Sequence, residues 1–303
     1  MSEKLQKVLA RAGQGSRREL EKAIGEGRVS VNGNVAKLGA RVEVADTIRL
    51  DGNLVNIEES EKQICRVIAY HKQEGELSTR KDPEGRDTVF DRLPKLRNSR
   101  WIAIGRLDTN TSGLMLFTTD GELANRLTRS KREIEREYAV RTFGEVLDKN
   151  IQHLRAGIEL KDEGKINFEK VKLQQGEGLN RWFHCILNKG RDRTVRQMWE
   201  HEEIQISRLI RLRYGKIALE KSLPRGGWQD LELPQVNYLR ELAGLEAETE
   251  SFLALREEHR NKTARIRRAV RKHQAFKKAD EQRAGKPAKN RNHRQGQKKR
   301  TRI

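Results

Sequence analysis

The sequence has few cysteines and no long apolar run, and these absences exclude several classes of protein. Cys65 and Cys185 are the only cysteines among 303 residues, which excludes the framework of several disulfides found in small secreted domains. No stretch approaches the roughly 18 consecutive apolar residues that a membrane-spanning helix needs. The first residues carry charges where a signal peptide would have an apolar segment. We therefore expect a soluble, cytoplasmic protein with no membrane partner.

Hydrophobic residues are also scarce, whereas charged residues are abundant. The hydrophobic fraction is 35% and the charged fraction is 36%, so part of the chain is not expected to contribute to a core. The formal net charge of +20 indicates a polyanionic partner, with nucleic acid as the first candidate. Residues 261–303 hold 17 Lys and Arg against two acidic residues, which is +15 of that +20. This excess indicates phosphate binding by a C-terminal tail and carries no information about chemistry.

Residues 3–50 are expected to form two short helices followed by a tight hairpin. Apolar residues recur with helical spacing between residues 3 and 12. Ser16 and Glu19 have the spacing of a capping box, in which each side chain bonds the backbone amide of the other residue. Asn32-Gly33 is a strong signal for a two-residue hairpin turn. On periodicity alone, an RNA-binding module and an ordinary solvated basic surface fit this pattern equally well.

The string LQKVLARAGQGSRRELEKAIGEGRVSVNGNVA resembles the RNA-binding module first described in small-subunit ribosomal protein four. The similarity spans roughly residues 3–50 and implies an RNA-binding domain over residues 1–58. Basic side chains and helix-terminal amides would contact phosphates there. The residues that we expect to bind RNA in this module are Lys7, Arg11, Ser16, Arg17, Arg18, Arg28 and Asn32.

The rest of the chain divides into a linker, a large domain and a tail. A charged, apolar-poor stretch indicates a linker over residues 59–65. Residues 66–243 mix strand and helix patterns, so the expected class is α+β, with a mixed, mainly antiparallel sheet and flanking helices. Helix formers and charge dominate residues 244–303. We expect a basic tail there that is helical over about 264–278 and disordered beyond Gly285.

The most informative segment is an apolar strand that leads into a polar loop containing a single acid, Asp108. An Asp in a loop is usually a turn or capping residue, so the loop alone would not single out Asp108. The full string GRLDTNTSGLMLFTTDGELANRL, however, resembles the central motif of the pseudouridine synthases, in the subgroup exemplified by RsuA and RluB. This resemblance implies that Asp108 is the catalytic nucleophile.

Two further segments fit the same family. Arg136-Glu137-Tyr138 resembles the motif whose tyrosine lies against the target base, and residues 188–198 resemble the third motif. In the family, the arginine that corresponds to Arg196 pairs with the catalytic aspartate. The resemblance therefore implies a catalytic set of Asp108, Tyr138 and Arg196. The third motif departs from the usual family residues at Asn188, Asp192, Thr194 and Gln197.

The implied chemistry needs no cofactor and no metal ion. Converting uridine to pseudouridine breaks the C1′–N1 bond, turns the base and joins C1′ to C5, so nothing enters or leaves. A carboxylate beside C1′ can attack that carbon or remove a sugar proton, and both roles stay open. Because the base must leave its stack, Arg106 either fills the vacated space or contacts a phosphate. The spacing of His184, Cys185 and His201 matches no standard metal site.

Three functions remain open from the sequence. The first is a monomeric synthase that modifies 23S rRNA near the peptidyl-transferase centre, with free rRNA or a ribosome-assembly intermediate as its substrate. The second is a synthase for 16S rRNA or for another 23S site. The third is a non-catalytic RNA-binding ribosome-assembly factor. The combination of Asp108, Tyr138 and Arg196 argues against the third function, whereas the basic tail fits all three.

Overall fold

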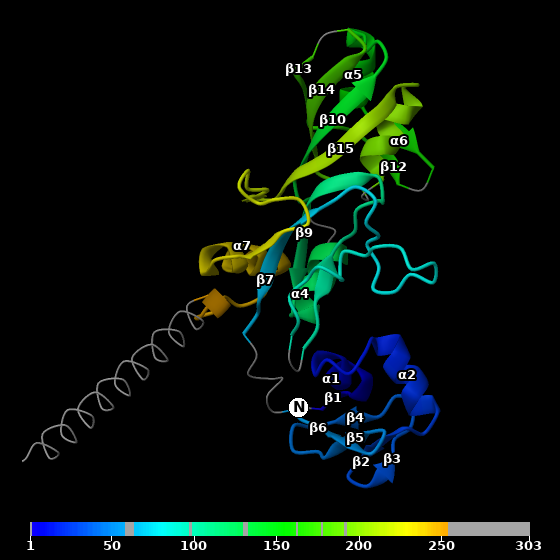
Figure 1. The fold of residues 1–303 in the computed structure, drawn as a ribbon, viewed down its shortest axis with the longest axis vertical. Coiled ribbons are helices and arrows are strands. Elements are labelled where there is room, and N and C mark those ends of the chain that lie inside the picture. Colours follow the sequence, from blue (N-terminus) through cyan, green and yellow to red (C-terminus); the bar gives the residue numbers. More distant parts are fainter. Residues whose placement is uncertain are drawn as a thin grey trace, which may run out of the picture. The chain divides into compact units, whose positions relative to one another are not determined.

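The computed structural model describes residues 2–57, 64–96, 99–129, 133–161, 163–176, 178–190 and 193–253 (Figure 1). Most of the expected linker therefore falls outside the described residues. The same holds for the expected helix over 264–278 and for the disorder expected beyond Gly285. None of the helices within the described ranges is both long and apolar enough to cross a membrane.

The N-terminal module contains the two expected helices. Strand β1 (Glu3–Lys4) pairs with β4 (Arg41–Val42), so helix α1 (Leu5–Arg11) begins slightly later than the apolar pattern suggested. Helix α2 (Arg17–Gly25) begins with the expected capping box. Ser16 Oγ accepts a hydrogen bond from the amide of Glu19 at 3.2 Å, and the amide of Ser16 donates to Glu19 Oε2 at 2.8 Å. The capping prediction is confirmed.

A small antiparallel sheet completes this module. Strands β2 (Val29–Val31), β3 (Asn34–Val35), β5 (Ile48–Leu50) and β6 (Asn53–Val55) lie in the order β3-β2-β5-β6. The β2–β3 turn is at Asn32-Gly33, where both residues have positive φ, 50° and 85°. Two successive positive φ values define the type I′ hairpin that the Asn-Gly pair predicted.

The second domain is built on a nine-stranded sheet with the order β13-β14-β10-β15-β9-β7-β17, to which β8 and β16 add at β9 and β15. Within the described residues, every strand pair of this sheet is antiparallel except β9 with β15. The expected mixed, mainly antiparallel sheet is confirmed. Its strands are β7 (Val67–Lys72), β8 (Ile102–Ile104), β9 (Thr111–Thr118), β10 (Arg136–Phe143), β13 (Lys170–Gln175), β14 (Asn180–Leu187), β15 (Gln205–Tyr214), β16 (Ile217–Ala218) and β17 (Trp228–Asp230).

Helices cover the two halves of this sheet separately (Figure 1). Helices α5 (Asp148–Ala156) and α6 (Thr194–His201), with the ribbon of β11 (Ile158–Leu160) and β12 (Gly164–Ile166), lie with β10, β13 and β14. Helices α4 (Gly121–Arg129) and α7 (Leu233–Ala243) pack with β7 and β9. Each half of the sheet therefore has its own hydrophobic core.

Strands β7 and β9 are buried on both faces. Because successive side chains of a strand point to opposite faces, Ala69 and Leu116 pack toward α4 and α7, whereas Tyr70 and Phe117 join a second cluster with Trp101. A strand buried on both sides is held firmly in place. The loop that contains Asp108 connects β8 to β9, so it is attached to the most rigid part of the sheet.

The parallel junction between β9 and β15 requires a glycine. Gly113, paired with Arg211, has φ of 107°, and a Cβ on it would lie 2.3 Å from the carbonyl oxygen of Arg211. No side chain fits this approach. The two halves of the sheet therefore meet backbone to backbone five residues after Asp108.

Candidate functional site

Asp108 occupies the first position of a β-turn. Its carbonyl oxygen accepts a hydrogen bond from the amide of Thr111 at 3.0 Å, which is the bond that closes a four-residue turn. The half-buried side chain of Asp108 lines a cavity of about 730 Å³. The other residues that line this cavity are Leu77, Ser78, Thr79, Arg106, Leu107, Thr109, Asn110 and Arg193.

The loop after β7 fixes this turn from one side. Ser78 Oγ donates to the carbonyl of Leu107 at 2.6 Å and accepts from the amide of Leu107 at 3.2 Å. The amide of Gly75 donates to the carbonyl of Thr109 at 2.8 Å. The residues on both sides of Asp108 are thus hydrogen-bonded to one loop. The sequence analysis did not identify Ser78, since a lone serine in a polar loop carries no local signal.

Lys72, the last residue of β7, lies beneath the same turn and is 0% exposed. Its Nζ donates to three backbone carbonyls, those of Gln73 at 2.9 Å, Thr109 at 3.2 Å and Thr111 at 2.8 Å. Burial lowers the pKa of Lys72 to about 8, and the negative charge of Glu76, followed by that of Asp108, opposes this shift. The structure thus places a buried ammonium group below Asp108 that sequence reasoning missed.

Of the residues expected to act with Asp108, Arg106 lies in its cavity and the other two do not line it. Tyr138 is on β10, where it is 0% exposed and belongs to a hydrophobic core. Arg196 is on α6, where its Nη1 donates to the carbonyl of Ile206 at 3.3 Å and its Nε is buried without a hydrogen-bond partner.

The expected pair between Asp108 and Arg196 is not formed in this structure. Both residues are described, and no hydrogen bond or ion pair joins their side chains within the described part of the chain. Arg193, three residues earlier in the third motif, lines the Asp108 cavity instead. The roles of Tyr138 and Arg196 in catalysis stay predictions.

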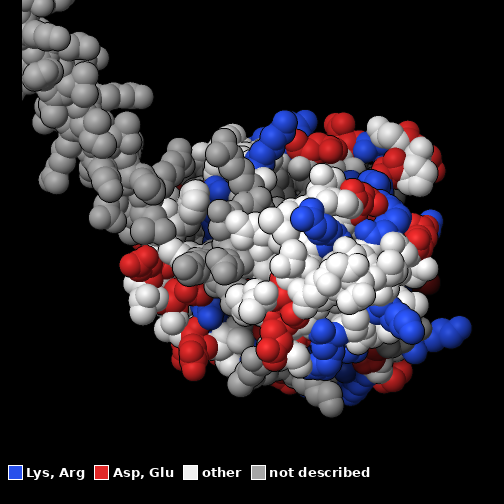
Figure 2. Space-filling view, turned by 90° about the horizontal axis from the view of Figure 1, so that it is seen from below, with Lys and Arg blue, Asp and Glu red and all other residues white. Residues whose placement is uncertain are grey.

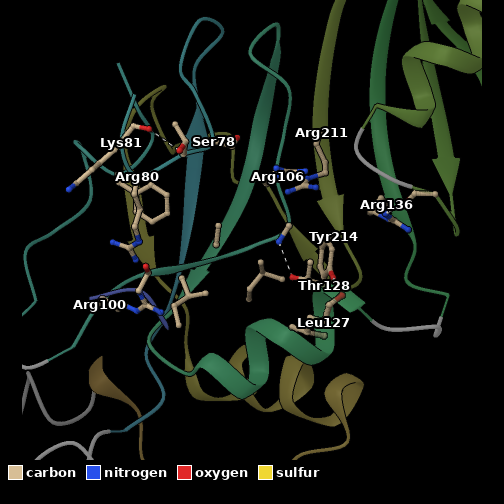
Figure 3. Close-up of a pocket in the computed structure, with 18 of the residues that line it drawn as sticks. Ser78, Arg80, Lys81, Arg100, Arg106, Leu127, Thr128, Arg136, Arg211 and Tyr214 are labelled. Atoms are coloured by element: carbon tan, nitrogen blue, oxygen red, sulfur yellow. Dashed lines mark hydrogen bonds between the residues drawn. The ribbon is translucent and has the colours of Figure 1, made fainter. Parts of the chain in front are cut away.

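A second, larger pocket shares Ser78, Thr79 and Arg106 with the Asp108 cavity. Figure 3 shows Arg80, Lys81 and Arg100 on one side of it, and Arg106, Arg136 and Arg211 on the other. Among the described residues that line it from the second domain, none is acidic. We call this surface the cationic groove. It forms an anion-binding wall beside Asp108.

Local packing holds several of these arginines. The Arg80 guanidinium lies 4.5 Å from the ring centre of Phe90. Burial, and then the like charge of Arg80, lowers the pKa of Arg100. Arg136 donates to the carbonyls of Gly190 at 2.7 Å and Asn188 at 2.9 Å, so it also supports the third motif. Like charges held close together favour an anionic ligand between them.

Most of the basic residues expected to bind RNA in the N-terminal module have acidic partners. Lys7 and Arg11 both contact Glu3, at 2.6 and 2.7 Å. The Arg28 guanidinium bonds both carboxylate oxygens of Asp51, at 2.7 and 2.6 Å, and this bonding lowers the pKa of Asp51. Figure 2 accordingly shows Lys and Arg groups interspersed with Asp and Glu groups rather than one continuous basic face.

The two polar residues expected to bind RNA also have structural roles. Ser16 caps α2, as described above. Asn32 donates to Asp46 at 2.8 Å and accepts from the amide of Thr47 at 2.9 Å. Arg17 and Arg18 differ, because within the described residues neither guanidinium has a hydrogen bond or ion pair. They are the cations of this module most readily available to phosphate.

No cluster of three His, Cys, Asp or Glu side chains that could hold a metal ion occurs in the described part of the chain. His184 and Cys185 lie on β14, where Cys185 is buried. Burial of the Cys185 thiol raises its pKa out of the reactive range.

Comparison with known proteins agrees with both domains. The S4 domain profile matches residues 3–48, and the RNA pseudouridylate synthase profile matches residues 66–201. Ribosomal large subunit pseudouridine synthase B of Escherichia coli (strain K12) is 60% identical over 276 residues, which cover 90% of this chain and 94% of that protein. The protein of the same name from Haemophilus influenzae is 57% identical over 91% of this chain and 78% of its own length.

A solved structure supports the fold. A pseudouridylate synthase crystal structure, 24% identical in sequence, superposes with a TM-score of 0.54 and covers 78% of this chain and 99% of that chain. Identity of about 60% over nearly the whole length, with both domains in the same order, leaves no other family to consider. The chain belongs to the RNA pseudouridine synthases that carry an N-terminal S4 domain.

Proposed function

We propose that this enzyme converts one uridine of large-subunit (23S) rRNA to pseudouridine, near the peptidyl-transferase centre. The observation that carries this proposal is the position of Asp108, on a fixed turn beside a groove lined by arginines. A carboxylate supplies the nucleophile or base, and the groove suits the phosphates on either side of a flipped nucleotide. The relatives named for the large subunit support 23S rRNA over 16S rRNA as the substrate.

Each residue of the proposed active site has a separate role. Asp108 attacks C1′ of the uridine or removes a sugar proton, and the base turns before C1′ joins C5. Arg106, which lines both the Asp108 cavity and the cationic groove, fills the space of the flipped base or holds a phosphate. Tyr138 is proposed to support the base, and Arg196 to stabilise the charge of Asp108 once RNA is bound. No cofactor takes part in this scheme.

The wider setting of the reaction is also a proposal. We place the enzyme in the cytoplasm as a monomer that acts on rRNA, either free or within an assembling ribosomal particle. Residues 1–58 would bind RNA, residues 59–65 would link the domains, residues 66–243 would carry out the chemistry, and residues 244–303 would add non-specific phosphate contacts. Lys7, Arg11, Ser16, Arg17, Arg18, Arg28 and Asn32 remain the proposed RNA contacts of the N-terminal module.

A pseudouridine map of rRNA from a strain that lacks the gene tests this function. One pseudouridine in 23S rRNA should be missing, and it should return with the wild-type gene but not with Asp108→Asn. A missing pseudouridine in 16S rRNA would replace the proposed substrate. An unchanged map combined with an assembly defect would instead support a non-catalytic assembly factor.

A further inference from the structure

Lys72 stands out among the charged residues of the molecule because its ammonium group is fully buried without a carboxylate partner. It is 0% exposed, and within the described residues no ion pair joins it to an acid. A buried charge is costly unless hydrogen bonds replace its hydration. An ammonium group has three N–H donors, and the three carbonyls described above, of Gln73, Thr109 and Thr111, satisfy all three.

Two of these carbonyls belong to the turn that presents Asp108. The bond from Thr111 N to Asp108 O closes the turn, and Lys72 binds the carbonyls of Thr109 and Thr111 within it. Lys72 and Thr111 are 39 positions apart in the sequence. The ammonium group therefore fixes the turn to the end of β7, which is buried on both faces and cannot easily move.

A separate network keeps the nearest buried acid away from the ammonium. Glu76 is 3% exposed and accepts hydrogen bonds from the Tyr70 hydroxyl, at 2.8 and 2.9 Å, and from the amide of Gln73, at 3.0 Å. It also pairs with Arg92 at 3.1 Å. The groups that act on the charge of Lys72 are Glu76, Asp108 and Glu74. Because Arg92 and the Tyr70 hydroxyl already occupy Glu76, the positive charge of Lys72 is left to act on Asp108.

We infer that Lys72 is a positioning residue for Asp108, which orients the catalytic turn through its three carbonyl bonds and stabilises the ionised carboxylate with its charge. The inference rests on the proposed function, since it assigns Asp108 to the reaction. Lys72 does not touch the substrate, because all three of its N–H donors are used. It supplies the fixed cation that Arg196 does not supply in this structure.

Three substitutions separate charge, anchoring and general packing. Lys72→Met keeps the chain length but loses both the charge and the three bonds. Ser78→Ala loses only the neutral bonds to Leu107 on the other side of Asp108. Tyr70→Phe is the matched control, because it removes a buried hydrogen bond to Glu76, two residues earlier on the same strand, and leaves the turn intact.

The measurements are the single-turnover rate on a 23S rRNA fragment from pH 4 to pH 8, and the affinity for that fragment. Lys72→Met should lower the rate on the order of a hundredfold, as a misplaced catalytic group does, with affinity unchanged. Its acid limb, where Asp108 becomes protonated, should move up by about one pH unit because a nearby cation is lost. Ser78→Ala should lower the rate less and leave the acid limb in place, and Tyr70→Phe should change neither.

The results can overturn the inference without touching the proposed function. A Lys72→Met enzyme with a wild-type rate and an unmoved acid limb would refute any positioning role. A slow enzyme whose acid limb stays in place would show a packing defect only, and would equally refute the electrostatic role. A wild-type enzyme that forms no pseudouridine in the fragment would refute the proposed function itself.

Discussion

The Asp108 turn and the basic surface of the N-terminal module are both expected to act on RNA, but they are held in opposite ways. Around Asp108 the holding bonds are buried and directed at backbone, from Lys72 and Ser78. On the N-terminal module, Arg28 is held by an exposed carboxylate, Asp51. Exposed ion pairs of this kind contribute only about 0–1 kcal/mol. A phosphate can therefore replace such a partner cheaply, whereas the geometry of the turn cannot be exchanged.

This difference matches what each part must do. Nucleophilic attack depends on placing a carboxylate within a fraction of an ångström of its target, so the supporting bonds must not break during the reaction. Binding a flexible RNA backbone requires cations whose partners can be exchanged. The predictions below test the contrast from its largest expected effect to its smallest.

Replacing the nucleophile should have the largest effect. Asp108→Asn keeps the shape of the side chain but removes its charge, and should lower the single-turnover rate by about a thousandfold or more. RNA affinity should stay within about twofold, because the phosphate contacts lie elsewhere. Rapid-quench assays with site-labelled RNA measure the first quantity and filter binding measures the second. A variant within about tenfold of the wild-type rate would remove Asp108 from the mechanism.

The backbone junction behind the turn should be the next most sensitive position. Gly113→Ala would place a Cβ 2.3 Å from the Arg211 carbonyl at φ of 107°, and should destabilise the second domain by about 3 kcal/mol or more. Gly33→Ala is the matched control, since its φ is 85° but nothing lies within 4 Å of the added Cβ. It should cost the N-terminal module about 1 kcal/mol. Equal losses in urea denaturation would show that backbone strain, and not the close approach, determines the cost.

The exchangeable cations should be distinguishable by salt. Replacing Arg17 and Arg18 together with Gln should reduce the log–log salt slope of RNA binding by about 0.7–0.9 for each phosphate that is no longer neutralised. Arg28→Gln should change the slope less, because Arg28 must first leave Asp51. Titrations at four salt concentrations would measure both slopes. A larger change for Arg28→Gln would reverse this order and identify the paired arginine as the principal phosphate ligand.

Local patterns in the sequence predicted local structure well. The Ser16–Glu19 spacing gave the capping box, and Asn32-Gly33 gave the type I′ turn, because both depend on residues only a few positions apart. The motif around Asp108 likewise indicated a strand followed by a polar turn. In each case the physical cause lies within the segment itself.

Contacts between distant segments could not be predicted in the same way. The bonds from Lys72 to Thr109 and Thr111 join positions 37 and 39 residues apart, and no local pattern marks a lysine at a strand end as buried. The pairing of Lys7 and Arg11 with Glu3 is also invisible to a count of basic residues. In the third motif, family resemblance pointed to Arg196, whereas the fold directs Arg193 toward the Asp108 cavity.

The smallest expected effect concerns Ser16, which was predicted to contact RNA and is found to cap α2. Ser16→Ala should destabilise the N-terminal module by about 1 kcal/mol because the Glu19 amide loses its acceptor, whereas glycine at an N-cap costs only a few tenths. Ser16→Gly therefore removes the hydroxyl while nearly keeping the helix. If the hydroxyl acts only as a cap, Ser16→Gly should bind RNA as the wild type does, and Ser16→Ala should lose affinity only near its lower melting temperature. A loss of affinity in Ser16→Gly at 10 °C, far below any melting transition, would instead mean that RNA contacts the hydroxyl directly, and that even this structural residue of the N-terminal module exchanges its partner on binding.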